Sequence, residues 1–238
     1  MPRLDVLVTR NGLAESRERA QALIIAGKVR VAGETVRRPD RSVSDDATIS
    51  VESGPDFASR GALKLGPALD RFHVDPNGRV CADIGASTGG FTDVLLRRGA
   101  LKVFAIDVGR GLIHWRLRQD PRVVVIERVN ARDLEAFPEA VSLIVVDVSF
   151  ISLEKVLPAL RRAGPSAEVV ALFKPQFEVG RTEVGKGGIV RDQAAIVAAL
   201  QRFRDWCPPN GYEVAGEAAS EVTGAEGNQE FLIHLMPL

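Results

Sequence analysis

Residues 79–91 have the sequence Arg79-Val-Cys-Ala-Asp-Ile-Gly-Ala-Ser-Thr-Gly-Gly-Phe91, and the rest of the chain is best interpreted outward from them. The apolar run at 80–84 predicts a buried strand, the glycines predict a turn, and a helix is expected from about Phe91. In an α/β sheet this junction lies at the carboxyl edge, where ligands bind. Glycines let the backbone approach a ligand closely, and the Asp83 carboxylate accepts hydrogen bonds.

The glycine spacing narrows the kind of ligand. Gly85-x-x-x-Gly89-Gly90 is not the Gly-x-Gly-x-x-Gly of dinucleotide-binding proteins, and it lacks the Lys-Ser/Thr of a phosphate-binding loop. An adenosine ligand without a phosphate chain, such as S-adenosylmethionine, is therefore the leading hypothesis. A strand-to-helix turn that binds nothing is the alternative.

Length and composition set the limits. A chain of 238 residues has room for one large α/β domain and a small module. With 26% charged residues, no apolar run of membrane-spanning length and no signal peptide at the start, we expect a cytoplasmic protein. Cys81 and Cys207 have neither disulfide-framework nor metal-ligand spacing, so we expect reduced thiols and no metal site.

The formal net charge is zero, but the charges are unevenly distributed. Residues 1–41 contain nine Lys and Arg against five Asp and Glu, and the remainder contains 22 against 26. A basic module joined to a faintly acidic body indicates a polyanionic partner.

The first fifty residues predict a helix-helix-hairpin unit. Apolar spacing over residues 4–11 predicts a short helix. A second helix is expected with Ser16 as its N-cap and Gly27 as its stop, and a tight hairpin is expected at 29–36. A polar, turn-rich linker follows, so the predicted boundaries are 1–53 for the module, 54–61 for the linker and 62–238 for the main domain.

This unit resembles the S4 RNA-binding module in three motifs: Leu4-Asp5-x-Leu7, Gly12-Leu13-Ala14-x-Ser16-Arg17-x-x-Ala20 and Ile25-Ala26-Gly27-Lys28-Val29-x-Val31-x-Gly33. The resemblance implies an α+β fold whose cations touch RNA phosphates, namely Arg17, Arg19, Lys28 and Arg30. The alternative is a solvated charged face without a partner.

The main domain alternates strands and helices, which is typical of a parallel sheet covered on both faces. A helix is predicted at 62–72 and another at 192–206. Seven strands are predicted, the last two antiparallel, at 79–83, 102–107, 122–127, 142–147, 168–173, 211–215 and 229–235. The expected fold class is therefore a Rossmann-like α/β sheet of seven strands with a small α+β module before it.

Polar residues follow three successive strands. Asp107 stands 22 residues after Gly85, a distance suited to an acid that accepts both ribose hydroxyls of an adenosine ligand. Asn130 follows the third strand, where its amide could contact an adenine edge. Acids at strand ends also cap helices, so a purely structural role is the alternative for each residue.

The fourth and fifth strands end on opposite charges, Asp147 and Lys174. Neighbouring strands lie about 4.8 Å apart, so these groups could meet at the sheet edge. A lysine can act as a base where burial or a second cation disfavours its charged form. Lys64 is a candidate for that cation and Glu230 for an orienting group, while a structural salt bridge is an equally open alternative.

The chain as a whole resembles the hemolysin A-type (TlyA) ribosomal RNA 2′-O-methyltransferase family. The motifs are Ser59-Arg60-Gly61-x-Leu63-Lys64-Leu65, Asp83-Ile-Gly-Ala-Ser-Thr-Gly-Gly-Phe91-Thr92-Asp93, Asp147-Val-Ser-Phe-Ile-Ser152-Leu153, Lys174-Pro-Gln-Phe-Glu178, Gly185-Lys-Gly-Gly-Ile-Val-Arg191-Asp192 and Gly227-Asn228-x-Glu230-Phe231. One departure is Ala62, where the family more often has glycine.

The resemblance implies a site and a reaction. The TlyA family is similar to FtsJ-type methyltransferases, whose Lys-Asp-Lys-Glu tetrad corresponds here to Lys64, Asp147, Lys174 and Glu230. The predicted S-adenosylmethionine contacts are Asp83, Gly85, Ser87, Thr88, Gly89, Gly90, Phe91, Asp107, Val108, Asn130, Ala131 and Asp147. Arg60 is predicted to contact RNA.

The implied function is 2′-O-methylation of a cytidine ribose in ribosomal RNA by in-line methyl transfer, with ribosomal RNA or a ribosomal subunit as partner. The start and end of the chain resemble the shorter branch of the family, which implies a narrower substrate range limited to the large-subunit RNA. A monomer is favoured. Two alternatives are a non-catalytic RNA-binding or ribosome-binding protein and, from the family's historical name, a cytolysin. The sequence shows neither an amphipathic cationic helix of useful length nor a secretion signal that would support a cytolysin.

Overall fold

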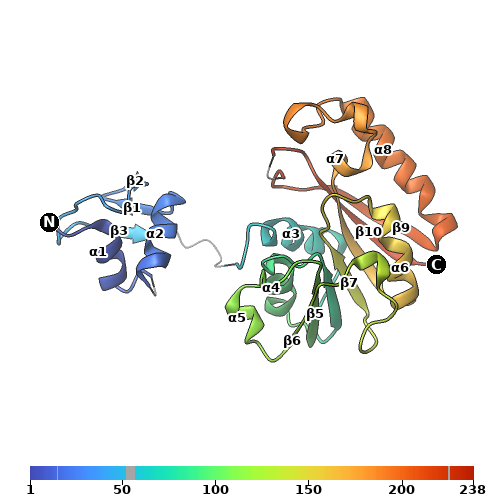
Figure 1. The fold of residues 1–238 in the computed structure, drawn as a ribbon, viewed down its shortest axis with the longest axis horizontal. Helices are drawn as coiled ribbons and strands as arrows, with labels where there is room; N and C mark the ends of the chain where they lie inside the picture. Colours follow the sequence, from blue (N-terminus) through green and yellow to red (C-terminus); the bar gives the residue numbers. More distant parts are fainter. Residues whose placement is uncertain (15, 52–56, 225) are drawn as a thin grey trace. The chain divides into compact units, whose positions relative to one another are not determined.

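The computed structural model describes residues 1–14, 16–51, 57–224 and 226–238, and the chain divides into two compact units, Met1–Asp56 and Phe57–Leu238 (Figure 1). The predicted linker residues Gly54, Pro55 and Asp56 lie outside the described residues. Phe57 and Ala58, also placed in that linker, belong to the larger unit and pack against its core.

The smaller unit has the predicted helix-helix-hairpin order, followed by one further strand. Its elements are α1 (Leu4–Arg10), α2 (Arg17–Ile25), β1 (Val29–Val31), β2 (Glu34–Val36) and β3 (Ile49–Val51). The Ser16 hydroxyl accepts a hydrogen bond from the Arg19 N–H at 3.1 Å, and Gly27 has a φ of 73° just after α2, which confirms the predicted cap and stop. Strand β3 pairs antiparallel with β1, and the sequence analysis did not predict it.

A buried carboxylate ties the smaller unit together. Asp5 is fully buried and accepts hydrogen bonds from the side chains of Arg3, Arg17 and Gln21. The bond from Arg3 leads these contacts in holding the pKa of Asp5 well below its usual range. Part of the positive charge of Arg17 therefore compensates the buried Asp5 carboxylate inside the unit.

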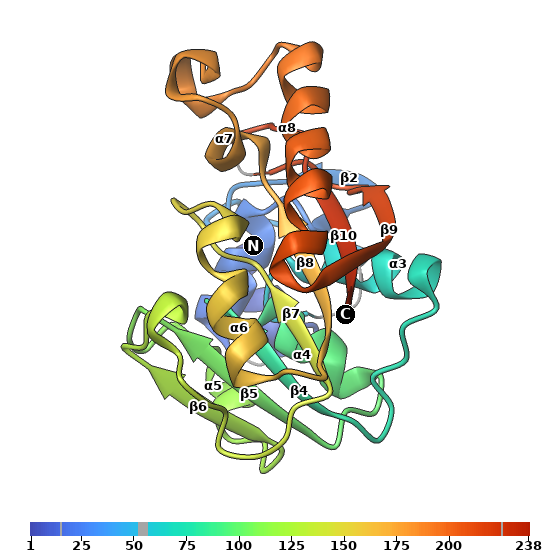
Figure 2. The ribbon, with the colours of Figure 1, turned by 90° about the vertical axis from the view of Figure 1, so that its right-hand side faces the viewer.

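The larger unit is a mixed sheet with helices on both faces (Figure 2). Its strands are β4 (Val80–Ile84), β5 (Lys102–Asp107), β6 (Val123–Glu127), β7 (Leu143–Val146), β8 (Glu168–Phe173), β9 (Tyr212–Ala219) and β10 (Phe231–Pro237). Its helices are α3 (Ala62–Phe72), α4 (Gly90–Arg97), α5 (Trp115–Arg118), α6 (Leu157–Ala163), α7 (Pro175–Glu178) and α8 (Gln193–Trp206). Its 3₁₀ turns are η1 (Ala131–Asp133), η2 (Leu153–Lys155), η3 (Arg181–Glu183), η4 (Lys186–Gly188) and η5 (Pro208–Asn210).

The strand order is β6-β5-β4-β7-β8-β10-β9, with β10 antiparallel to both its neighbours and the other pairs parallel. This confirms the seven-stranded Rossmann-like sheet and its antiparallel end. The order reverses between β4 and β7, and ligands bind at such a switch point. Strand β9 runs to Ala219, four residues past the predicted end, because its second half pairs with β10.

Alternate residues of each strand face opposite layers. In β8, Val169, Ala171 and Phe173 belong to the core under α6 and α8, whereas Val170 and Leu172 belong to the core under α3 and α4. Both faces are buried, which is why the central strands are nearly continuous aliphatic runs. No helix among the described residues is long and apolar enough to cross a membrane.

Candidate active site

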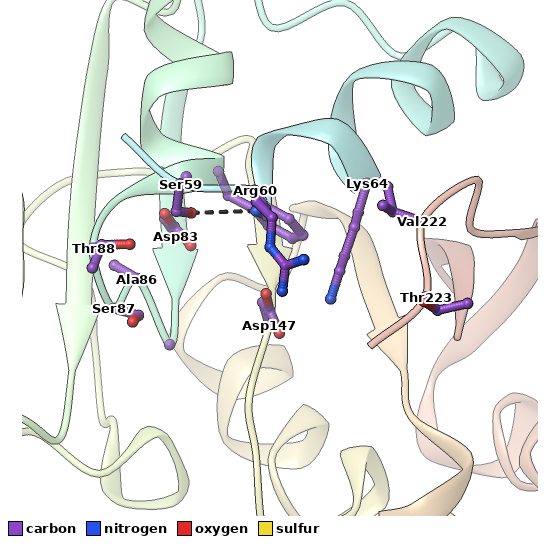
Figure 3. A pocket seen from close by; sticks show the side chains of 14 residues that line it. Ser59, Arg60, Lys64, Asp83, Ala86, Ser87, Thr88, Asp147, Val222 and Thr223 are labelled. Carbon is purple, nitrogen blue, oxygen red and sulfur yellow. Dashed lines mark hydrogen bonds between the residues drawn. The ribbon is translucent and has the colours of Figure 1, made fainter. Parts of the chain in front are cut away.

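The glycine turn after β4 forms one wall of a cavity of about 400 Å³ at the carboxyl edge of the sheet. Gly85 has a φ of 80°, and a β-carbon added there would lie 2.4 Å from the backbone oxygen of Asp147. Only glycine fits this close approach between β4 and β7. The remaining walls come from residues 59–61 and Lys64 at the start of α3, from Asp147 after β7 and from residues 222–223 (Figure 3).

Asp83 has one satisfied and one unpartnered carboxylate oxygen. Its Oδ2 accepts hydrogen bonds from the Thr92 N–H at 2.8 Å and the Thr92 hydroxyl at 2.6 Å, whereas the buried Oδ1 has no hydrogen-bond partner among the residues that the structure describes. Burial is the main cause that raises the pKa of Asp83 to about 7. A buried acceptor without a partner in a cavity wall is what a hydrogen-bond donor of a ligand would satisfy.

A second cavity of about 610 Å³ shares Gly85, Ser87 and Asp147 with the first and extends past the ends of β5 and β6. Asp107 accepts hydrogen bonds from the Ser87 N–H at 2.8 Å and the Gly109 N–H at 2.7 Å, so it is held in place by the turn it faces. The predicted contacts Val108, Asn130 and Ala131 also line this cavity.

Asn130 has a structural role besides any contact with a ligand. Its side-chain oxygen accepts a hydrogen bond from the Arg132 N–H at 3.1 Å and caps η1. Gly89 lines neither cavity, and a β-carbon there would meet Leu117 Cδ1 at 2.3 Å. It allows α5 to pack closely against the turn.

The charges at the ends of β7 and β8 meet. Lys174 Nζ lies 2.5 Å from Asp147 Oδ1 and donates a hydrogen bond to the Ser149 hydroxyl at 2.9 Å. The Lys174 side chain is 9% exposed, so this pair sits largely out of water. Burial makes each charge depend on its partner, because removing one would leave the other without compensation.

A second lysine–carboxylate pair joins α3 to β10. Lys64 Nζ lies 2.5 Å from Glu230 Oε2, and the two side chains are 14% and 3% exposed. Glu230 precedes Phe231, which pairs with Phe173 in the antiparallel register of β10 and β8, so Glu230 is next to the strand end that carries Lys174. Three adjacent strands thus supply Asp147, Lys174 and Glu230.

Lys64 and Asp147 line the same cavity, as does Arg60. Figure 3 shows Arg60 and Lys64 pointing into it above Asp147, with Val222 and Thr223 beside Lys64. The predicted contacts Ser87, Thr88, Gly90 and Phe91 also line it. Lys174 and Glu230 do not line this cavity. Each pairs with a residue that does: Lys174 with Asp147, and Glu230 with Lys64.

Several residues at the site escaped the sequence analysis. Thr92 holds Asp83, Ser149 holds Lys174, and Phe150 is 90% exposed beside the second cavity with a φ of 65°. Thr92 lies at the start of the helix after the glycine turn, a position whose N–H is free to bond a nearby carboxylate, so that signal was available. No local pattern marks Ser149, since its partner Lys174 is 25 residues away.

The predicted RNA contacts of the smaller unit differ in how exposed they are and in what they contact. Lys28 and Arg30 are exposed on either side of Val29, and Arg19 is half-buried. Arg17 Nε lies 3.1 Å from Asp5 Oδ2 while half of its side chain is exposed.

Comparison with known proteins defines the class. Residues 57–236 match the FtsJ-like methyltransferase family, and residues 2–49 match the S4 domain. The chain therefore belongs to the FtsJ-like methyltransferase family and carries an S4 domain, as the sequence motifs predicted. The larger unit is a methyltransferase domain.

Three relatives give this assignment detail. The 16S/23S rRNA (cytidine-2′-O)-methyltransferase TlyA of Mycobacterium tuberculosis is 48% identical over 98% of this chain and 89% of its own length. The 23S rRNA (cytidine-2′-O)-methyltransferase TlyA of Campylobacter jejuni is 37% identical over 75% of this chain and 70% of its own. A solved structure from Streptococcus thermophilus, described with the word hemolysin, is 41% identical with a TM-score of 0.78, covering 99% of this chain and 88% of that one.

Proposed function

We propose that this protein transfers a methyl group from S-adenosylmethionine to the 2′-hydroxyl of a cytidine ribose in ribosomal RNA. The observation that carries the proposal is the placement of two largely buried lysine–carboxylate pairs, Lys174–Asp147 and Lys64–Glu230, beside the cavity of the glycine turn. The substrate is inferred from the two TlyA relatives, both named cytidine-2′-O-methyltransferases.

The two cavities suit a nucleoside ligand with an amino acid tail. The unpartnered Asp83 Oδ1 would accept a hydrogen bond from a donor of the cofactor, and Gly85 leaves room for close approach. Asp107 is fixed by Ser87 and Gly109 where it would accept ribose hydroxyls. When bound, S-adenosylmethionine supplies a methyl group on a positively charged sulfur.

The four tetrad side chains would act on the ribose hydroxyl. As the general base, Lys174 would take the hydroxyl proton onto Nζ, and the ribose oxygen would then be the nucleophile toward the methyl group that S-adenosylmethionine would supply. Asp147 and Lys64 hold the hydroxyl in line, and Glu230 fixes Lys64. Positioning supplies much of the rate, and general-base help is worth roughly 10²–10⁴-fold.

The S4 unit would bring the RNA to this site. Exposed Lys28 and Arg30 suit phosphate contacts, which position a nucleic acid without reading its bases. The relatives act on 16S and 23S rRNA in one case and on 23S rRNA in the other, so we propose the large-subunit RNA as the common substrate.

The test is transfer of labelled methyl from S-adenosylmethionine to ribosomal RNA or subunits, followed by mapping of the 2′-O-methyl positions. The wild-type protein should modify a cytidine, and Lys174→Ala should lose nearly all transfer while still binding the cofactor in calorimetry. Transfer by Lys174→Ala at the wild-type rate would contradict the tetrad. Binding of RNA without binding of cofactor would instead favour a non-catalytic RNA-binding protein.

A further inference from the structure

Glu178 is the last residue of α7, and its carboxylate holds the end of the loop that follows β7. Its Oε2 accepts a hydrogen bond from the Ser152 hydroxyl at 2.7 Å, and its Oε1 accepts one from the Leu153 N–H at 2.8 Å. Both oxygens are therefore used by two consecutive residues. The reaction proposed above gives Glu178 no task.

The same loop begins at the tetrad. Asp147 and Ser149 both contact Lys174, which immediately precedes α7. The four-residue helix is thus attached to both ends of the loop, through Lys174 at its start and through Glu178 at its end. A shift of the Glu178 side chain would therefore be transmitted to Lys174 either through α7 or through residues 149–153 of the loop.

The middle of the loop is held in an unfavourable conformation. Phe150 has a φ of 65°, which is uncommon for a bulky residue and persists only where the surroundings impose it. Its ring lies 5.3 Å from the ring of Phe177, which is also in α7. Glu178, the residue after Phe177, accepts the two hydrogen bonds that fix the end of this loop.

The acid at this place is costly to bury when it is ionised. Burial is the main cause that raises the pKa of Glu178 to about 7, against the hydrogen bonds from Leu153 and Ser152. Of the neighbouring charges, Glu154 raises this pKa further and Arg202 lowers it. The ionised carboxylate is therefore costly to bury, and a neutral side chain would be less so.

We propose that Glu178 is a positioning residue for methyl transfer, which fixes the loop at Ser152 and Leu153 so that Ser149 stays on Lys174. The inference rests on the proposed function and assigns the carboxylate no contact with a reacting atom. Glu178→Ala removes both acceptors. In Glu178→Gln, the amide oxygen can still accept from Leu153 and the amide N–H can donate to the Ser152 hydroxyl.

The experiment compares these variants by single-turnover methyl transfer, cofactor calorimetry and thermal unfolding. Glu178→Ala should slow the transfer step about 10²-fold, the cost of a small misplacement, while cofactor affinity and KM for RNA stay near wild type. Glu178→Gln should restore most of the rate. Tyr212→Phe is the matched control, since it removes a buried hydrogen bond to the Leu157 carbonyl, in the core cluster that also contains Leu153, and this bond involves none of residues 147–153.

Two results would overturn the proposal: a folded Glu178→Ala protein that transfers at the wild-type rate, or a rate loss that Tyr212→Phe reproduces at equal loss of thermal stability. A failure of the proposed function looks different. In that case the wild-type protein itself binds cofactor and RNA but transfers no methyl group, and the role of Glu178 falls with it.

Discussion

Lys64 Nζ and Glu230 Oε2 lie 2.5 Å apart, although one residue is in the first helix of the larger unit and the other directly precedes its last strand. The contact joins segments near the two ends of this unit's sequence. Because both side chains are largely buried, neither charge can rely on water if the other is removed. Stability and catalysis should therefore respond differently to changes in this pair.

Lys64→Met should destabilise the larger unit by about 3 kcal/mol, since it leaves the Glu230 carboxylate buried without its cation. The double variant Lys64→Met/Glu230→Gln should regain most of that stability because no charge remains buried. Methyl transfer should stay about 10²-fold below wild type in both, because the substrate hydroxyl loses a positioning group. Urea unfolding measures the predicted changes in stability, and single-turnover assays measure methyl transfer. Recovered transfer in the double variant would count against a role of Lys64 in the mechanism.

Gly85→Ala should abolish measurable cofactor binding, because its β-carbon would lie 2.4 Å from the Asp147 backbone oxygen and force β4 and β7 apart at the cavity. Gly111→Ala is the control, since it has a similar φ of 69° but nothing within 4 Å of the added carbon. The control should cost only about 1 kcal/mol of conformational free energy. Calorimetry with S-adenosylmethionine decides, and equal binding by both variants would rule out the close approach as a binding determinant.

Asp83 should make the stability of the larger unit fall as pH rises. Burial raises its pKa from 3.8 to about 7, so the folded state favours the protonated acid. Its contribution to the free energy of unfolding is then complete below about pH 4 and lost by about pH 7, a total on the order of 4 kcal/mol by linkage. Asp83→Asn should remove this fall and be the more stable protein at pH 8.

Unfolding of the larger unit can be followed by the fluorescence of Trp115 and Trp206, which are the chain's two tryptophans. The difference between wild type and Asp83→Asn isolates Asp83 from Glu178, whose pKa burial raises likewise. Parallel pH profiles for the two proteins would contradict the assignment.

Lys28→Ala should weaken ribosomal RNA binding and lower the salt dependence of the binding constant by about one phosphate contact, without changing stability. The lysine is exposed just after α2, so its loss leaves the core of the S4 unit intact. Arg38→Ala is the control, because Arg38 already pairs with Asp40 at 3.2 Å. Filter binding over a range of salt concentrations measures both, and identical salt slopes would remove Lys28 from the interface.

Local patterns predicted most of the fold. The β4 strand, the glycine turn and α3 came from aliphatic runs and helical spacing, because strands buried on both faces and amphipathic helices leave those periods in the sequence. The same patterns put Asp83, Asp107, Asp147 and Lys174 at strand ends, and parallel strands bring their ends to one edge. The Asp147–Lys174 contact followed from that rule alone.

Other relationships have no local signal. The Lys64–Glu230 pair depends on β10 running antiparallel beside β8, and the Glu178 contacts with Ser152 and Leu153 depend on how α7 packs on the loop after β7. Arg17 was predicted as an RNA contact from its motif, but only the fold brings it to the buried Asp5.

The sequence by itself therefore determined the class of fold, the edge of the sheet that carries the site and the residue types available there, since these follow from periodicity and strand polarity. The tertiary structure decided which charges are paired, which acceptors such as Asp83 Oδ1 are left unpartnered among the described residues, and which residues hold the loop after β7. Those outcomes depend on contacts between segments far apart in the chain, and burial, which sets the strength of every charge interaction, exists only once those segments have packed.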